Sequence, residues 1–119
     1  MVEEKILLTY GLEKKDLDFF KMSGLKYNEI TTEIAGSKIE DILKGIEPVK
    51  YDGAIPNEKV ILINGFNDKE LNTVVKMVRA TMGKGVILAV VTETSASWTF
   101  SYLLEHLIEE REWYKKNGK

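Results

Sequence analysis

The chain has 119 residues, of which 44% are apolar and 30% charged, and its formal net charge is −2. This balance is that of one folded domain, too apolar for a disordered chain and without the basic excess of a protein that binds nucleic acid. With no cysteine and one histidine, the chain cannot form disulfides, thiolate sites or a metal site built from several of its own histidines.

Targeting and cofactor signals are also missing from the sequence. Residues 1–5 lack the basic-then-apolar form of a signal peptide, and no apolar run approaches the roughly 20 residues that span a bilayer. There is no G-x-G-x-x-G or Walker loop, and Gly83-Lys84-Gly85 precedes an expected strand rather than a helix. We therefore expect a cytoplasmic protein with no membrane association, no metal and no cofactor.

The first half of the chain is expected to fold as strand, helix, strand, helix. The first three of these elements cover residues 5–9, 14–22 and 27–34. The third mixes β-branched and polar residues, which is typical of an exposed edge strand. Ser37 and Glu40 have the spacing of a capping box, and they open a second helix whose apolar positions continue to Ile46.

The second half repeats this order. Its expected elements are a strand over 60–63, a helix over 68–82, a strand over 86–92, a polar loop over 93–97 and a helix over 100–116. Asn67 is expected to cap the first of these helices, with Glu70 completing a capping box. The strand over 86–92 is almost wholly apolar, which is typical of a strand covered on both faces.

A pattern shared by the two halves predicts an internal repeat. Lys5, Gly11 and Leu17 recur 54 positions later as Lys59, Gly65 and Leu71. We expect one domain over residues 1–119, in which repeat one covers 5–46, a connection with both prolines covers 47–58, and repeat two covers 59–117.

Two consecutive βαβα units predict an α/β fold with one mainly parallel four-stranded sheet. The favoured strand order is 2-1-3-4, with helices on both faces and a pseudo-two-fold axis along the strands. The alternative is a two-layer sheet with an antiparallel contact between the repeats.

The favoured order places the first candidate site between two turns, Tyr10-Gly11 and Asn64-Gly65. Ligands of open parallel sheets bind beyond the carboxyl ends of the strands, at the point where the strand order reverses. Free backbone N–H groups at the starts of two helices point there and suit an anion. The alternative is that both glycines serve tight turns and that Asn67 only caps its helix.

The second candidate site lies at the end of the last strand. It combines hydroxyl groups, a carboxylate and an indole, which suit the recognition of a polar ligand, in Thr92, Glu93, Thr94 and Trp98. Part of this stretch has an explanation without a ligand, because Thr99 can cap the last helix while Trp98 packs on Leu103.

The last helix carries three further residues of interest. His106 lies among acidic residues and is expected to be a surface histidine, because no nucleophile motif accompanies it. Trp113 and Tyr114 form either an apolar patch for a partner or ordinary packing. A homodimer through this helix or through a sheet edge is one option, and the sequence identifies no other partner.

Four motifs in the second half resemble a known family. They are N-G-F at Asn64, D-x-E-L at Asp68, A-V-V-T-E-T at Ala89, and W-T followed by L-L-E-x-L from Trp98. Over residues 59–108 the chain resembles the domain of unknown function numbered 3783, found mainly in anaerobic bacteria. The resemblance implies no activity, cofactor or substrate. It directs attention to the second half for any site.

Two functions follow as expectations. The favoured one is a non-enzymatic binding or regulatory module, because the sequence lacks a nucleophile–base pair, a metal-ligand set and a cofactor loop. The alternative is a protein that binds a small ligand or an anion, or an enzyme, and that uses the crevice at the strand ends. In that case Glu93 is the base or anchor, and Asn64, Thr92 and Thr94 are polar contacts. No catalytic residue is assigned.

Overall fold

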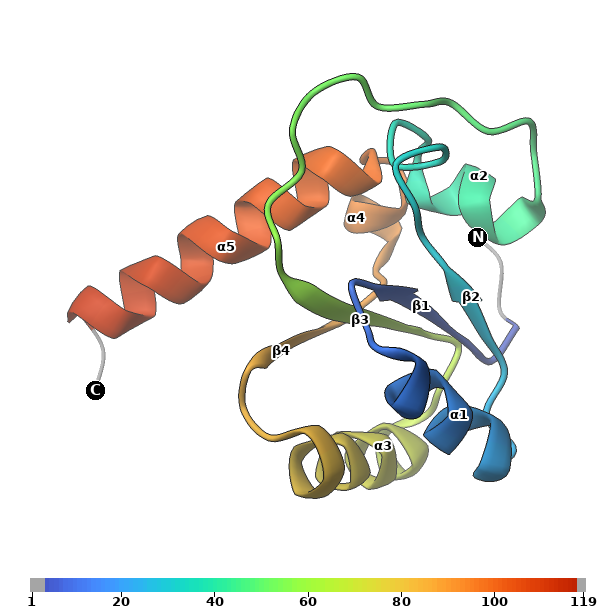
Figure 1. The fold of residues 1–119 in the computed structure, drawn as a ribbon, viewed down its shortest axis with the longest axis vertical. Coiled ribbons are helices and arrows are strands. Elements are labelled where there is room, and N and C mark those ends of the chain that lie inside the picture. The colour runs from blue at the N-terminus through green and yellow to red at the C-terminus, as the bar shows by residue number, and fades with distance from the viewer. Residues whose placement is uncertain (1–3, 118–119) are drawn as a thin grey trace. The chain divides into compact units, whose positions relative to one another are not determined.

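The computed structural model describes residues 4–117 of the chain (Figure 1). In chain order, its elements are β1 (Ile6–Tyr10), α1 (Lys14–Met22), β2 (Tyr27–Glu29), α2 (Ile39–Lys44), β3 (Lys59–Asn64), α3 (Asp68–Met82), β4 (Val86–Val90), α4 (Glu93–Ala96) and α5 (Phe100–Asn117). The predicted βαβα order is kept in each half, and one short helix, α4, is added in the second.

The chain divides into two compact units, and each takes residues from both halves of the sequence. Unit 1 runs to Thr31 and continues from Pro56 to Thr92, so it holds the four strands together with α1 and α3. Unit 2 covers Thr32–Ile55 and the chain from Glu93 onward, with α2, α4 and α5. These boundaries differ from those of the predicted repeats, and the single domain stays a prediction.

Unit 1 is built on a four-stranded sheet in the order β2-β1-β3-β4, which confirms the predicted order. The outer pairs, β1–β2 and β3–β4, are parallel. The central pair, β1–β3, is antiparallel, with Ile6 opposite Asn64 and Tyr10 opposite Val60. The predicted two-fold axis along the strands is therefore wrong, because it would make β1 and β3 parallel. The short apolar runs of these strands look the same in either direction, so they do not indicate whether β1 and β3 pair parallel or antiparallel.

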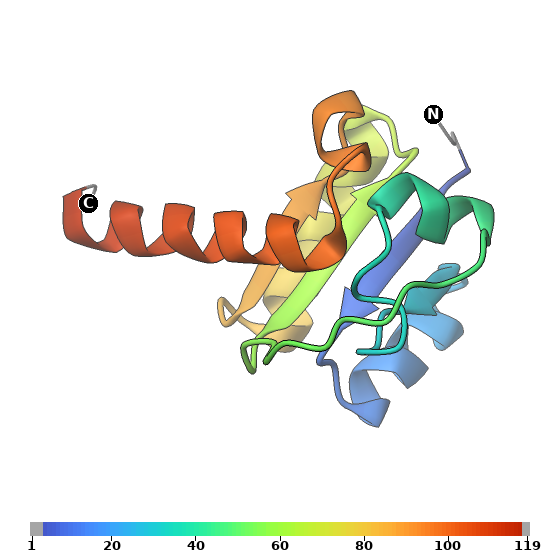
Figure 2. The same ribbon diagram turned by 90° about the horizontal axis from the view of Figure 1, so that it is seen from above.

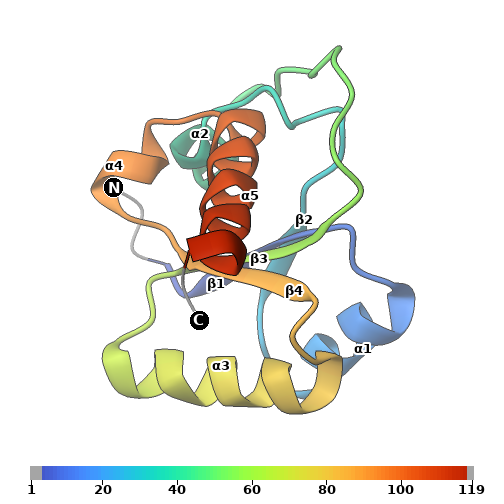
Figure 3. The same ribbon diagram turned by 90° about the vertical axis from the view of Figure 1, so that its left-hand side faces the viewer.

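In unit 1, α1 and α3 lie on the same face of the sheet (Figure 3). The core beneath them consists of Leu7, Phe20, Ile61, Ile63, Val74, Val78 and Val86. Because successive strand residues point to opposite faces, Leu8 and Leu62 point away from these helices, and both are buried as well. Burial of both residue sets explains why β1 and β3 are continuous apolar runs rather than alternating ones.

Both helices of unit 1 have the predicted bounds. At α3, the Asn67 side chain accepts a hydrogen bond from the N–H of Glu70 at 2.8 Å, and the Glu70 carboxylate accepts one from the N–H of Asn67 at 3.0 Å. This confirms the predicted capping box. At α1, the N–H of Glu13 donates to the Asp16 carboxylate at 3.2 Å. These two residues stand 54 positions before Asn67 and Glu70.

Unit 2 contains a short antiparallel bridge between Lys38 and Thr99, which directly precede α2 and α5. Figure 2 shows α5 towards the red end of the colour scale. The N–H of Ile39 donates to the carbonyl of Trp98 at 2.9 Å. The buried apolar residues of this unit are Ala35, Ile39, Ala96, Phe100, Leu103 and Leu104. The N–H of Tyr102 donates to the Thr99 hydroxyl at 3.2 Å, which confirms Thr99 as the cap of α5.

The predicted capping box at Ser37 is wrong. The Ser37 hydroxyl accepts a hydrogen bond from the N–H of Val49 at 2.7 Å, and α2 begins one residue later than expected, with Lys38 as its N-cap. The bridge to Thr99 holds Lys38 in an extended conformation, so α2 begins only at Ile39. At the other end, Gly45 in the left-handed conformation ends α2, which leaves Ile46 outside the helix and 51% exposed.

Three predictions about the strands and the loop after them need correction. β2 is an edge strand as expected, but it ends at Glu29, and Ile30 makes its last backbone bond to β1. β4 ends at Val90 rather than Thr92, and it is only partly buried after Val86, with Val90 47% exposed, so the predicted strand covered on both faces is wrong. The predicted polar loop after it contains the short helix α4.

No helix in the described part of the chain is long and apolar enough to cross a membrane.

Candidate functional site

Unit 1 has a cleft of about 500 Å³ between α3 and the turn that follows α1. Its lining, which defines what we call the α1–α3 cleft, consists of Lys5, Ser23, Gly24, Leu25, Lys26, Phe66, Lys69, Glu70, Thr73, Val74 and Met77. Small-molecule sites have volumes of roughly 300–1,000 Å³, so the cleft has the size of a ligand site.

The wall on the α1 side is formed by the turn that ends this helix. Gly24 has a φ of +76°, in the left-handed region that favours glycine. Its N–H donates to the carbonyl of Lys21 at 3.1 Å, and the N–H of Leu25 donates to the carbonyl of Phe20 at 3.0 Å. These bonds satisfy the last carbonyls of α1 and turn the chain toward β2, which leaves Leu25 half-buried.

The wall on the α3 side is one face of the helix. Glu70, Thr73, Val74 and Met77 have the i, i+3, i+4, i+7 spacing that puts side chains on the same side of a helix. Val74 is buried, Met77 is half-buried, and Phe66, just before the cap, is half-buried too. The floor of the cleft is therefore apolar.

The rim of the cleft is positively charged. Its lining holds three lysines, Lys5, Lys26 and Lys69, but only one carboxylate, Glu70. Lys5 pairs with Glu70, and Lys26 pairs with Glu4. Within residues 4–117, Lys69 makes no ion pair. A net positive cleft stands out in a chain whose net charge is −2.

Glu70 has a structural role at this rim. Its pKa lies below the ordinary value because Lys5 donates a hydrogen bond to the carboxylate and the backbone N–H of Asn67 donates another. Such a carboxylate is ionised at neutral pH and poorly suited to act as a general acid or base. Among the described residues, no group of three or more histidines and acids could hold a metal ion.

The ion pair at the cleft has a counterpart in unit 1. Lys59 lies 3.8 Å from Asp16, and each stands 54 positions from its counterpart in the cleft pair. The same shift relates Thr73, which lines the cleft, to Phe19, whose ring is half-buried against the core. The cleft therefore has a small side chain where the matching place on α1 has an aromatic ring.

The structure contradicts the predicted crevice between the two strand-end turns. β1 and β3 are antiparallel, so Gly11 and Gly65 follow opposite ends of the central strand pair. Gly11 serves a close backbone approach, because a Cβ there would lie 2.1 Å from the carbonyl oxygen of Glu58. Beside it, burial raises the pKa of Tyr10, whose hydroxyl donates to the carbonyl of Pro56 at 3.2 Å.

The six predicted ligand contacts are divided between the units. Unit 1 holds Asn64, Gly65 and Thr92, and unit 2 holds Glu93, Thr94 and Trp98. Asn64 is buried, and its side-chain amide donates to the carbonyl of Glu4 at 2.8 Å, whereas Thr92 is exposed. Because β3 and β4 are parallel, Asn64 and Thr92 both lie where the carboxyl ends of these two strands meet. Ligand binding by the six residues stays a prediction.

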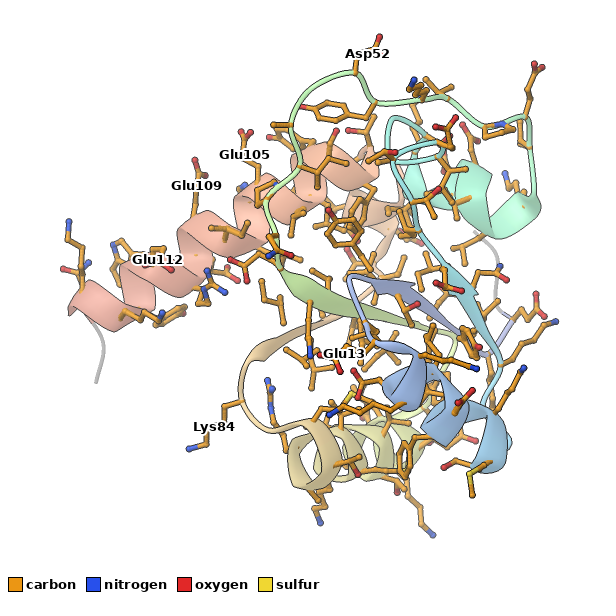
Figure 4. The ribbon with its side chains drawn as sticks, in the orientation of Figure 1. Glu13, Asp52, Lys84, Glu105, Glu109 and Glu112 are labelled. Atoms are coloured by element: carbon orange, nitrogen blue, oxygen red, sulfur yellow. The ribbon has the colours of Figure 1, made fainter. Side chains whose placement is uncertain are left out.

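Aromatic side chains lie just before α5 and along it. The ring of Trp98 lies 4.9 Å from that of Tyr102 and 5.2 Å from that of His106, between centroids. His106 is exposed, as predicted. Trp113 and Tyr114 are 57% and 60% exposed, which favours an apolar patch over ordinary packing. Glu105 and Glu109 point away from the same side of this helix (Figure 4).

Sequence reasoning missed the α1–α3 cleft. Its residues come from three stretches far apart in the chain, at Lys5, at the end of α1 and along α3. The only sequence features near it were the match of Lys5 with Lys59 and the glycine, Gly24, after the helix expected over 14–22, and neither indicates a cleft by itself.

Fold and cleft together define a small mixed α/β protein with an apolar, cation-rimmed surface cleft. Residues 59–114 match the family described as "Domain of unknown function (DUF3783)", which confirms the resemblance that the motifs of the second half predicted. The chain is 29% identical, over 114 residues, to a protein of Methanosarcina acetivorans named "Probable GTP 3',8-cyclase". That match covers 90% of this chain but only 34% of the relative. No solved structure matches the chain.

Proposed function

We propose that the chain is a non-enzymatic binding module and that the α1–α3 cleft is its binding site. The observation that carries this proposal is a cleft of about 500 Å³ with an apolar floor and a charged rim, formed within one compact unit. The absence of catalysis is supported by Glu70, the carboxylate of the lining, which is engaged by Lys5 and by the α3 cap.

A ligand-panel experiment tests the proposal. The melting temperature of the protein is measured with a panel of small metabolites, including GTP because the relative's name mentions it, and each ligand that binds is screened for turnover. A ligand at ten times its Kd is expected to raise the melting temperature by a few degrees, because it binds the folded state alone. Conversion of any bound ligand to product would contradict a non-enzymatic module.

Thr73→Phe provides the decisive variant, because it puts into the cleft the residue type that Phe19 supplies at the matching position of α1. Thr73 is exposed, so the variant is expected to fold and to lose the ligand response. Thr81→Phe is the matched control, since it adds the same ring to an exposed position of the same helix outside the lining. An unchanged ligand response in Thr73→Phe would rule out the cleft as the site.

We also infer that the chain arose by duplication of a strand–helix unit. The central strand register supports this, because Leu8 pairs with Leu62, its own counterpart 54 positions later. The flanking pairs of β1 and β3 exchange with one another under the same shift. A chain with a single copy of the unit has one central strand, and this strand is then expected to pair with the same strand of a second molecule, as β1 pairs with β3. Sedimentation that shows a folded monomer would contradict the inference. The cytoplasmic location and a homodimer of the present chain stay predictions.

A further inference from the structure

We infer that the α1–α3 cleft takes an amphipathic organic anion, with its apolar body on the floor and its anionic group at the lysine rim. This inference rests on the proposed function, which makes the cleft a binding site, and adds the chemical class of the ligand.

The charge of the rim selects an anion. The single carboxylate of the lining, Glu70, already accepts hydrogen bonds from Lys5 and from the N–H of Asn67. Lys69 is exposed and has no ion-pair partner in the part of the chain that the structure describes. Lys26 is 65% exposed in its pair with Glu4, and exposed ion pairs contribute little, so an incoming anion can recruit it cheaply.

The floor of the cleft requires an apolar body. Val74 is 3% exposed, and Leu25, Phe66 and Met77 are half-buried along the same opening. Covering these side chains removes apolar surface from water, and the flexible thioether of Met77 adapts to more than one shape. A small polyanion would leave this floor wet, and a neutral apolar molecule would leave Lys69 without a partner. An amphipathic anion uses both features.

Two matched fluorescent probes test the class of ligand. The probes are 8-anilinonaphthalene-1-sulfonate, which is anionic, and N-phenyl-1-naphthylamine, which has the same aromatic body without the sulfonate. We expect the anionic probe to bind more tightly and to weaken as salt is raised. Dodecanoate as competitor is expected to displace it, which would extend the class from aryl to acyl anions; failure to displace would contradict a shared anion site.

The lysine variants locate the anionic group. Lys69→Gln is expected to raise the Kd of the anionic probe about five-fold, the upper end for an exposed ion pair, and to leave that of the neutral probe unchanged. Lys76→Gln, at an exposed lysine of the same helix outside the lining, is the matched control and should change neither Kd.

The outcomes separate this inference from the proposed function. Equal affinity for both probes, unaffected by Lys69→Gln but lost in Thr73→Phe, would overturn the anion class and keep the cleft as a binding site. If the anionic probe binds Thr73→Phe as tightly as the parent chain, it lies elsewhere, and both proposals fail. Melting temperatures of the variants close to that of the parent chain show that each loss of binding is local.

Discussion

Replacing Gly11 with alanine tests a close backbone approach in unit 1. Gly11 directly follows β1, with a φ of +74°, and a Cβ built on it lies 2.1 Å from the carbonyl oxygen of Glu58. The left-handed conformation alone costs a non-glycine residue about 1–2 kcal/mol. Since a Cβ does not approach a backbone oxygen to 2.1 Å, the backbone must also shift, which costs about 1–3 kcal/mol by analogy with an overpacked core. We therefore expect Gly11→Ala to reduce the free energy of unfolding by about 2–5 kcal/mol.

Gly24→Ala separates the two costs. Gly24 has nearly the same φ, +76°, but a Cβ there meets no atom within 4 Å. It should lose only the conformational part, about 1–2 kcal/mol. The free energies of unfolding are measured by urea denaturation of the parent chain and both variants. Equal losses in the two variants would refute the close approach of Gly11 to Glu58.

Three further predictions concern stability. Phe20→Ala, at a fully buried position, should lose about 3–5 kcal/mol in urea denaturation, and a loss below about 1 kcal/mol would contradict its place in the core. Asn67→Ala removes the acceptor for the N–H of Glu70 and should cost about 1 kcal/mol in the same assay; no loss would argue against the cap. The pKa of Glu70 is lowered in the folded chain, so its contribution to stability is present above its ordinary pKa of 4.5 and is lost as pH falls through the folded value. Glu70→Gln should therefore lose less stability than the parent chain on acidification below that pH, and identical pH profiles would contradict the assignment.

Helices α1 and α3 could be predicted from end to end because their signals are local. Asn67 and Glu70 lie within one turn of each other, and the apolar stripe of α3 repeats every three or four residues. Ser37 and Glu40 have the same spacing, yet the box does not form. There a bridge to Thr99, far along the chain, holds Lys38 extended, and the Ser37 hydroxyl accepts a hydrogen bond from the N–H of Val49 instead of capping the helix. A tertiary contact thus overrides a correct local pattern.

The strand order was predictable, but the antiparallel direction of the central pair was predicted only by the alternative and not by the favoured arrangement. β1 and β3 are joined by a long path that includes the connection at 47–58, and no residue pattern in either strand marks its direction. This one error also hid the cleft. Lys5 precedes β1 and Glu70 follows β3, so only an antiparallel pair brings their side chains to the same edge of the sheet. With a parallel pair, the expected site moves to the Gly11 and Gly65 turns, which the structure separates.

A ¹⁵N–¹H correlation spectrum of the whole chain, titrated with dodecanoate, tests the ligand site most directly. Our account predicts saturable shifts at Lys5, at Ser23–Lys26 and along the first half of α3, with Thr92 to Trp98 unchanged. Shifts centred on Thr92, Glu93 and Thr94, with Lys69 and Thr73 unaffected, would contradict it and return the site to the end of the last strand.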